Sequence, residues 1–328
     1  AKVQDKRSFI RAVGEALARP REVGQLELIW SRFSRHKLAV LGVWVLVALF
    51  VASFAGPLFS PYDPEAQFVG PIFGELTAAN PLGTDDVGRD VMTRLMYAGR
   101  ISLLMALIVT LASSVIGVVV GAASGYFGGW VDTLSMRLVD FMLTLPILPL
   151  LLIMSAMSIR GGLPIAFPET LTRLFGWIWD MPPERAEGVL ILAVILIIFQ
   201  WQTLARLVRG QVLTLRSTAY SEAAQALGAS SLHIIARHMI PNTLAPIIVA
   251  TTFNFGGVII TEAALSFVGF GVQAPSASWG SMLNGVRDFI MLQPWRAFVP
   301  GLTIFLASMS INFIGDALRD ALDPRLKL

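Results

Sequence analysis

The stretch SEAAQALGASSLHIIARHMIP, Ser221–Pro241, is a polar and helix-prone insert between two strongly apolar segments. Its first part, Glu222–Leu227, consists almost wholly of strong helix formers. Gly228 can adopt the left-handed conformation that ends a helix, Leu232–Ile240 can form a second short helix, and Pro241 suits the first turn of a further one. Hydroxyl side chains able to cap the two short helices precede them, namely Ser217, Thr218, Ser230 and Ser231. The insert therefore predicts two short helices at an angle, followed by a long apolar helix.

The composition is that of a membrane protein. The 328 residues are 55% hydrophobic and 14% charged, with a mean hydropathy of +0.68, whereas soluble domains are roughly one quarter charged. The absence of cysteine excludes disulfides, thiolate metal sites and cysteine nucleophiles. The net charge of +3 is small, and basic residues flank apolar runs rather than forming one stripe, so no nucleic-acid partner is expected.

A membrane-spanning helix needs about 20 mostly apolar residues. Stretches of comparable length without Asp, Glu, Lys or Arg are 38–62, 101–131, 141–159, 188–205, 238–261 and 297–315. A seventh, 263–286, is rich in Pro, Ser, Gly and Trp in its second half, and we interpret it as the end of the fifth span and a loop. The sequence therefore predicts an all-α polytopic membrane protein with six transmembrane helices.

The orientation follows from the basic residues, which concentrate in cytoplasmic loops. If the residues before Leu38 are cytoplasmic, 17 of the 25 lysines and arginines lie inside, including all the lysines. This orientation places both termini in the cytoplasm, and the insert on the cytoplasmic side between spans four and five. We do not interpret the first apolar run as a cleaved signal peptide, because it is long and follows a charged tail.

The tail before the first span carries an amphipathic pattern. One helical face collects Leu26, Ile29, Trp30 and Phe33, beside Arg32 and Arg35. This pattern predicts a helix on the inner membrane surface. The alternative is a plain solvated helix.

The insert resembles the cytoplasmic signature of permease subunits of ATP-binding-cassette (ABC) importers. The positions that carry the resemblance are Glu222, Ala223, Ala224, Gly228, Ile240 and Pro241. The resemblance implies that the insert docks in a groove of a cytoplasmic ATPase and transmits closure of the ATPase dimer to the membrane helices. Without the resemblance, an ordinary amphipathic connector is an equally good interpretation.

Further segments resemble one branch of that family, the C-type permeases for dipeptides, oligopeptides and nickel, with the dipeptide-permease subunit as the nearest form. They are Asn80–Ala106, Gly125–Asp132, Ala264–Leu283 and Gly315–Lys327. The resemblance implies a type I ABC importer permease (MetI-like) fold and a heterodimer with a homologous B-type permease. It also implies two ABC ATPase subunits, a periplasmic substrate-binding protein, and a di- or oligopeptide substrate, with nickel or another small solute as the alternative.

The resulting domain organisation has five parts. They are a cytoplasmic tail (1–37), a first transmembrane helix (38–59), a periplasmic loop (60–100), a permease core (101–319) with its coupling loop (217–241), and a cytoplasmic tail (320–328). A Walker-type phosphate loop needs a lysine that follows glycine, and no lysine of this chain does. We therefore expect no catalytic residue and no cofactor here, with ATP and Mg²⁺ on the partner ATPases.

Glu262 is the one acid between two long apolar stretches. A buried carboxylate is costly in a membrane, so it should face protein or water. It either lines the transport pathway, where it could meet a peptide amino group, or lies near the outer end of span five and bonds to a loop.

Other polar groups suggest structure rather than chemistry. Asp85, Asp86, Arg89 and Asp90 form an outer charged cluster without histidine, which we interpret as a loop staple or a docking surface. His233 and His238 are five residues apart, so we do not expect them to share a helix face as a zinc pair would, and no metal site is predicted.

Glycines and prolines mark the predicted spans. Gly117, Gly121, Gly125 and Gly129 recur every four residues, a spacing that favours close helix packing in lipid. Pro146, Pro149 and Pro246 can kink helices. The outer loop Arg160–Gly188 contains Trp177 and Trp179, which fit an interfacial anchor or contact with a binding protein.

A polytopic membrane protein of this composition can also belong to two other functional classes. An ion-coupled secondary transporter would usually contain internal repeats and a midplane ion site, for which Glu262 is the sole candidate. A membrane-embedded enzyme would need clustered polar residues within its spans, and none is evident in the sequence.

Overall fold

The computed structural model describes residues 25–163, 165–291 and 293–322. Four helices in this part of the chain are long and apolar enough to cross a membrane. They are α3 (Lys37–Phe54), α4 (Val91–Phe127), a continuous helix Ser231–Phe267, and α14 (Trp295–Leu322). The continuous helix consists of α11 (Ser231–Ile234), a π-helical turn (Ile235–Met239) and α12 (Ile240–Phe267).

Two further candidate spans are bent pairs of helices. α5 (Gly129–Thr144) meets α6 (Ile147–Ile159) at 88°, and α8 (Pro183–Ile198) meets α9 (Gln202–Arg216) at 41°. The predicted six spans are reached only if each bent pair counts as one crossing. The 88° bend falls at Pro146, one of the prolines expected to kink a helix, whereas the sequence analysis did not predict the bend between Ile198 and Gln202.

Local backbone chemistry explains both bends. Leu145 is extended (ψ 137°), as expected for a residue before proline, and Pro146 starts the new helix direction. At the second bend, the side-chain amide of Gln202 donates to the Ile198 carbonyl at 2.8 Å. That bond gives the Ile198 carbonyl, at the end of α8, a hydrogen-bond partner at the point where the helix direction changes.

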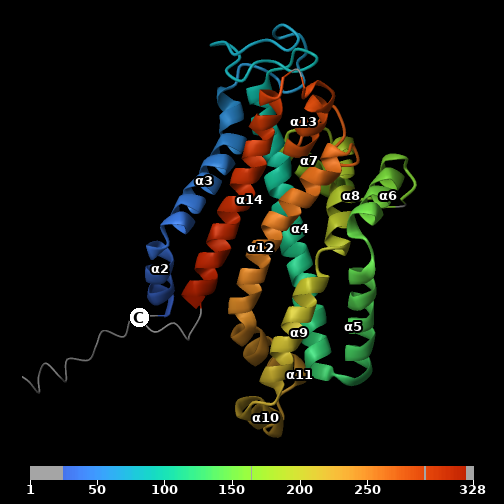
Figure 1. Ribbon diagram of the computed structural model, residues 1–328. Helices are drawn as coiled ribbons and strands as arrows, with labels where there is room; N and C mark the ends of the chain where they lie inside the picture. The colour runs from blue at the N-terminus through green and yellow to red at the C-terminus, as the bar shows by residue number, and fades with distance from the viewer. Residues whose placement is uncertain (1–24, 164, 292, 323–328) are drawn as a thin grey trace, which may run out of the picture.

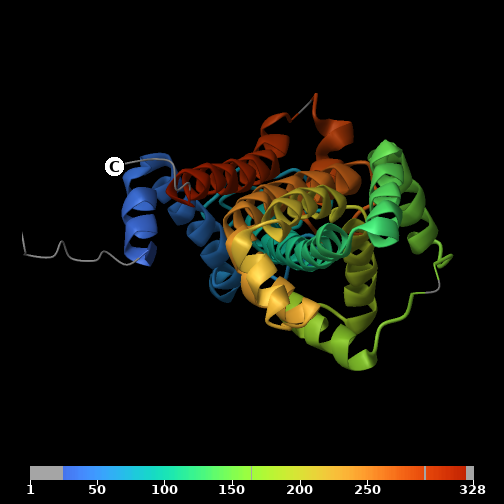
Figure 2. The same cartoon turned by 90° about the horizontal axis from the view of Figure 1, so that it is seen from below.

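The helices form one bundle, seen from two directions in Figures 1 and 2. α3 and α14 lie on one flank, α4 and α12 lie in the middle, and α5 and α6 lie on the opposite flank. The shorter elements are α2 (Gln25–Arg35), η1 (Gly56–Phe59), α7 (Glu169–Trp179), α10 (Ala219–Ala226), α13 (Trp279–Val286) and η3 (Arg287–Phe289). α13 lies at one end of the bundle, and α10 lies beyond the other end (Figure 1).

α4 packs against α9 through a seam of glycines. A Cβ atom at Gly117 would lie 2.8 Å from the Trp201 carbonyl oxygen, and one at Gly125 would lie 2.9 Å from that of Arg209. Gly121 approaches the Ala205 carbonyl in the same way. These three glycines let the two backbones touch, whereas Gly129 has no heavy atom within 4 Å of such a Cβ and plays no part.

α4 begins earlier than the charge-free stretch predicts. Asp90 caps it by accepting a hydrogen bond from the Thr93 N–H at 2.7 Å, so the last ten residues of the predicted loop 60–100 are helical. Two arginines enter the helix because each has partners: Arg94 pairs with Asp85 at 3.5 Å, and Arg100 donates to the Ser53 carbonyl at 2.9 Å. A span defined as a stretch without charged residues begins only at residue 101 and so leaves out these first ten residues of α4.

The predicted amphipathic helix in the tail is present as α2. Its Phe33 is buried against Ala317 and Ala321 of α14, whereas Trp30 is 69% exposed. The apolar face therefore packs partly on protein, and a surface role stays a prediction for the exposed part. The basic residues before Gln25 lie outside the described range, as do the side chain of Leu26 and residues 323–328.

The outer loop 160–188 folds around α7. Trp179 is 1% exposed and packs on Phe175 with ring centroids 5.0 Å apart, while Trp177 is 81% exposed. Only Trp177 therefore fits an interfacial anchor, and the expectation for Trp179 is wrong. Contact of this loop with a binding protein stays a prediction.

Candidate functional site

The insert has the predicted two-helix form. Glu222, Ala223 and Ala224 lie on α10, and Gly228 follows it with φ +83°. The Ala229 N–H returns to the Ala224 carbonyl at 3.1 Å, which closes the turn. No heavy atom lies within 4 Å of a Cβ built on Gly228, so its backbone conformation, rather than crowding, calls for glycine.

Hydroxyl groups hold the insert to α9 and start α11. Ser221 is 4% exposed and donates to the Leu215 carbonyl at 2.9 Å. Ser230 caps α11 by accepting from the His233 N–H at 3.4 Å. Thr218 occupies the N-cap position of α10 but makes no capping bond, because its hydroxyl donates to the Leu215 carbonyl instead.

The six motif residues divide between two surroundings. Ala224 and Ile240 pack against one apolar cluster formed by Val208, Val212, Ile234, Ile235 and Met239. Glu222, Ala223, Gly228 and Pro241 are exposed. The motif thus joins a buried half, fixed to α9 and α12, to an accessible half that another protein can contact.

Sequence reasoning missed the most exposed apolar side chains of the insert. Leu227 is 89% exposed and Leu232 is 75% exposed, on either side of the Gly228 turn. Tyr220 is 41% exposed on the same projection. Their signal was the presence of leucines in a polar loop, since isolated leucines there have no core of their own to bury into.

The helix after Gly228 departs from α-helical geometry. The π-helical turn Ile235–Met239 brings His233 and His238 together, with ring centroids 5.9 Å apart and an edge-on arrangement. The expectation that these histidines do not share a face is therefore wrong, because residues five apart align in a π turn. Among the described residues, no group of three or more potential metal ligands is present.

Glu262 is buried near the C-terminal end of α12, with 1% of its surface exposed. Its carboxylate accepts hydrogen bonds from Ser266 at 2.6 Å and from Ser102 of α4 at 3.3 Å. Ser102 in turn accepts from the Trp279 N–H at 3.1 Å, and Ser278 donates to Ser266 at 3.2 Å. The partners Ser266 and Ser102 lie on α12 and α4, and Ser278 at the start of α13 joins them through Ser266. A structural role and a pathway-lining role for Glu262 both stay predictions.

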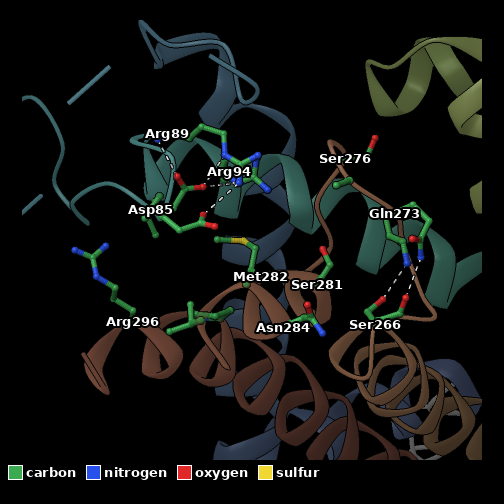
Figure 3. A pocket seen from close by; sticks show the side chains of 18 of the residues that line it. Asp85, Arg89, Arg94, Ser266, Gln273, Ser276, Ser281, Met282, Asn284 and Arg296 are labelled. Atoms are coloured by element: carbon green, nitrogen blue, oxygen red, sulfur yellow. Dashed lines mark hydrogen bonds and ion pairs between the residues drawn. The ribbon is translucent and has the colours of Figure 1, made fainter. Parts of the chain in front are cut away.

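The outer charged cluster lines a pocket of about 320 Å³, which we call the outer pocket (Figure 3). Arg89 and Arg94 are turned toward Asp85, at 2.7 Å and 3.5 Å. Arg296 donates to the Gly74 carbonyl at 2.9 Å. The charged groups of this pocket are thus paired with one another or with the backbone, as expected for a loop staple.

Two models of known protein families match most of this chain. Residues 114–328 match the family model described as "Binding-protein-dependent transport system inner membrane component", and residues 24–76 match "N-terminal TM domain of oligopeptide transport permease C". The chain therefore belongs to the family of binding-protein-dependent transport system inner membrane components, which are multi-pass inner-membrane permeases.

Several named proteins are similar to this chain over nearly its whole length. A putative peptide permease protein of Brucella suis is 35% identical, over 98% of this chain and 97% of its own length. The dipeptide transport system permease protein of Bacillus subtilis is 36% identical over 91% of this chain and 85% of its own. The glutathione transport system permease protein of Pectobacterium atrosepticum is 36% identical over 91% and 90%.

Proposed function

We propose that this chain is a permease subunit of an ATP-driven importer that moves di- and oligopeptides across the inner membrane. Family membership and the names of the relatives support the transport class and the peptide cargo. The chain lies in the membrane with both termini in the cytoplasm, so that the projecting α10–α11 insert faces the cytoplasm. Substrate passes between this chain and a homologous B-type permease, after delivery by a periplasmic binding protein.

One observation carries the coupling role. The insert extends beyond the membrane helices at one end of the bundle (Figure 1), and its tip presents Leu227 and Leu232. Apolar side chains so exposed on a projection outside the lipid are typical of a protein contact. Helix-in-groove docking on an ATPase subunit would bury them, with Glu222, Ala223 and Gly228 at the contact.

The buried half of the insert provides the mechanical connection. Ser221 is bonded to the end of α9, and Ile240 begins the uninterrupted α12. A push on α10 would therefore pass to α9 through Ser221, and a push on α11 would pass along the continuous helix Ser231–Phe267 to α12. ATP hydrolysis takes place on two partner ATPase subunits, and this chain performs no chemistry itself.

The test is transport by the reconstituted assembly in proteoliposomes. We expect uptake of a radiolabelled dipeptide to require ATP on the side of the membrane where the ATPase subunits bind. Uptake should persist when ion gradients are collapsed. ATP-independent uptake driven by an ion gradient would contradict the proposal. Nickel uptake in the same assay checks the alternative cargo.

The coupling role is tested at the two leucines. Leu227→Asp and Leu232→Asp should each reduce ATPase co-purification, because a charge replaces a buried apolar contact. Leu58, 80% exposed on η1 at the other end of the bundle, offers a matched control, and Leu58→Asp should leave co-purification unchanged. Equal co-purification for all three variants would contradict the docking role.

A further inference from the structure

A second pocket, of about 330 Å³, lies between α6, α8 and the segment 270–276. We call it the side pocket. It shares a wall with the outer pocket, because Val272, Gln273, Ala274 and Ser276 line both. The two pockets differ in how well their polar groups are satisfied.

Two hydroxyl groups of the side pocket are buried without a partner. Ser155 of α6 is 2% exposed, and neither its Oγ nor the Oγ of Ser276 makes a hydrogen bond within the described chain. A buried hydroxyl without a partner costs about 1–3 kcal/mol. Ser276 lies in the wall that the two pockets share, whereas Ser155 lines the side pocket and not the outer pocket. Both unpartnered hydroxyls therefore face the side pocket, where each can accept a hydrogen bond from a bound molecule.

The charge of the side pocket is negative. Arg185 is its single cation among the described lining residues, and Arg185 is paired with Glu65. Glu184 is exposed and makes no ion pair within the described chain. Glu187 is half-buried and accepts only the Phe167 N–H, at 3.3 Å. Two carboxylates at the pocket thus lack a compensating cation.

We propose that the side pocket binds a primary ammonium group carried by a small, partly apolar molecule. An ammonium has three donors and no acceptor, so it matches carboxylates and unpartnered hydroxyls together. The buried side chains of Val189, Leu192 and Ile195 line the same pocket and suit an adjacent apolar group. The identity of this ligand rests on the proposed function: it is the amino terminus of a short peptide during its passage across the membrane.

The electrostatic part can be tested without transport. The chain contains no cysteine, so Ser155→Cys in the full complex, with partner cysteines removed, introduces one thiol into the pocket. We expect the ratio of the modification rate by a cationic methanethiosulfonate reagent to that by an anionic one of similar size to exceed the same ratio for a free thiol in solution by at least about fivefold. Glu184→Gln combined with Glu187→Gln should return the ratio to the free-thiol value. A ratio equal to that of the free thiol in the unaltered pocket would overturn the proposal.

Matched variants guard against trivial effects. Ser308 is also buried, 7% exposed, with an unpartnered hydroxyl, but it lines neither pocket. Reactivity of Ser308→Cys should not respond to the two Glu→Gln changes. Ser158→Cys, at a half-buried position of the same pocket, replaces Ser155→Cys if the latter does not assemble.

The ligand class is tested by protection. Dialanine with a free amino terminus should slow modification of Ser155→Cys, whereas N-acetyl-dialanine at the same concentration should not. Protection by both peptides, or by neither, overturns the ammonium site. ATP-driven dipeptide uptake by the wild-type complex is measured in parallel. Normal uptake without selective protection refutes this inference alone, and failure of that uptake refutes the proposed function.

Discussion

Arg209 of α9 and Asp132 of α5 form an ion pair, with Arg209 Nη2 lying 2.5 Å from Asp132 Oδ2. Asp132 also accepts a hydrogen bond from Ser124 of α4. This pair therefore links α9, to which the insert is bonded through Ser221, with α5, the first helix of the bent α5–α6 pair. The neighbouring pair of Arg206 with Asp140 is much more exposed, with side chains 53% and 62% accessible.

The difference in exposure predicts different stabilities for the two arginine variants. Arg209→Ala should lower the free energy of unfolding by about 2 kcal/mol, because it leaves Asp132 partly buried without its cation. Arg206→Ala should lower it by less than about 1 kcal/mol, since exposed pairs contribute little. Thermal unfolding of the purified complex compares the two, and equal midpoints would argue against a structural role for the Asp132 pair.

Gly228 should be required for coupling rather than for folding. Gly228→Val forces a β-branched residue to φ +83°, at about 1–2 kcal/mol of backbone strain. We expect several-fold lower uptake and weaker ATPase association in a complex that still folds, with a melting temperature lowered by only a few degrees. The control is Gly210→Val, on a helical glycine that also has no neighbour within 4 Å. Wild-type uptake and association in Gly228→Val would refute this role.

The glycine seam should tolerate no side chain. Gly121→Leu would push α4 away from the backbone of α9, so we expect a loss of about 3 kcal/mol or more, or failure to assemble. Gly257→Ala provides the comparison on α12, where nothing lies within 4 Å, and should be neutral or slightly stabilising. The yield of folded complex after detergent extraction measures both.

Two substitutions separate the interpretations of Glu262. Glu262→Gln keeps a hydrogen-bonding group toward Ser102 and Ser266, whereas Glu262→Leu leaves both hydroxyls without it. If Glu262 is structural, the leucine variant should be about 2 kcal/mol less stable than the glutamine variant, and uptake per folded complex should be normal for glutamine. A stable glutamine variant with lost uptake would instead support the pathway role.

Local sequence features predicted much of the insert. The left-handed position at Gly228 and the cap at Ser230 follow from neighbouring residues, because turns and caps are decided within a few positions. The apolar stretches likewise follow from composition alone. The same local rules failed at Leu145–Pro146, because they indicate that a kink can occur but not its 88° angle.

Long-range partners and departures from helical period were beyond the sequence. Ser102 lies far from Glu262 in the chain, so no local pattern links them. His233 and His238 met only because the intervening turn is π-helical, while sequence reasoning assumed the α period. The side pocket combines residues of α6, α8 and a distant loop, and its unpartnered hydroxyls became visible only once those elements were placed.

The length of α4 has a geometric consequence. Its 37 residues make a rod of about 55 Å, which packs on α9 through Gly117, Gly121 and Gly125 in its second half and contacts Trp279 through Ser102 in its first half. A tilt of about 5° at one end of such a rod displaces the other by roughly 5 Å, about the width of a peptide backbone. A small tilt of α4 at the end near the insert would thus move its other end far enough to widen or narrow an opening there.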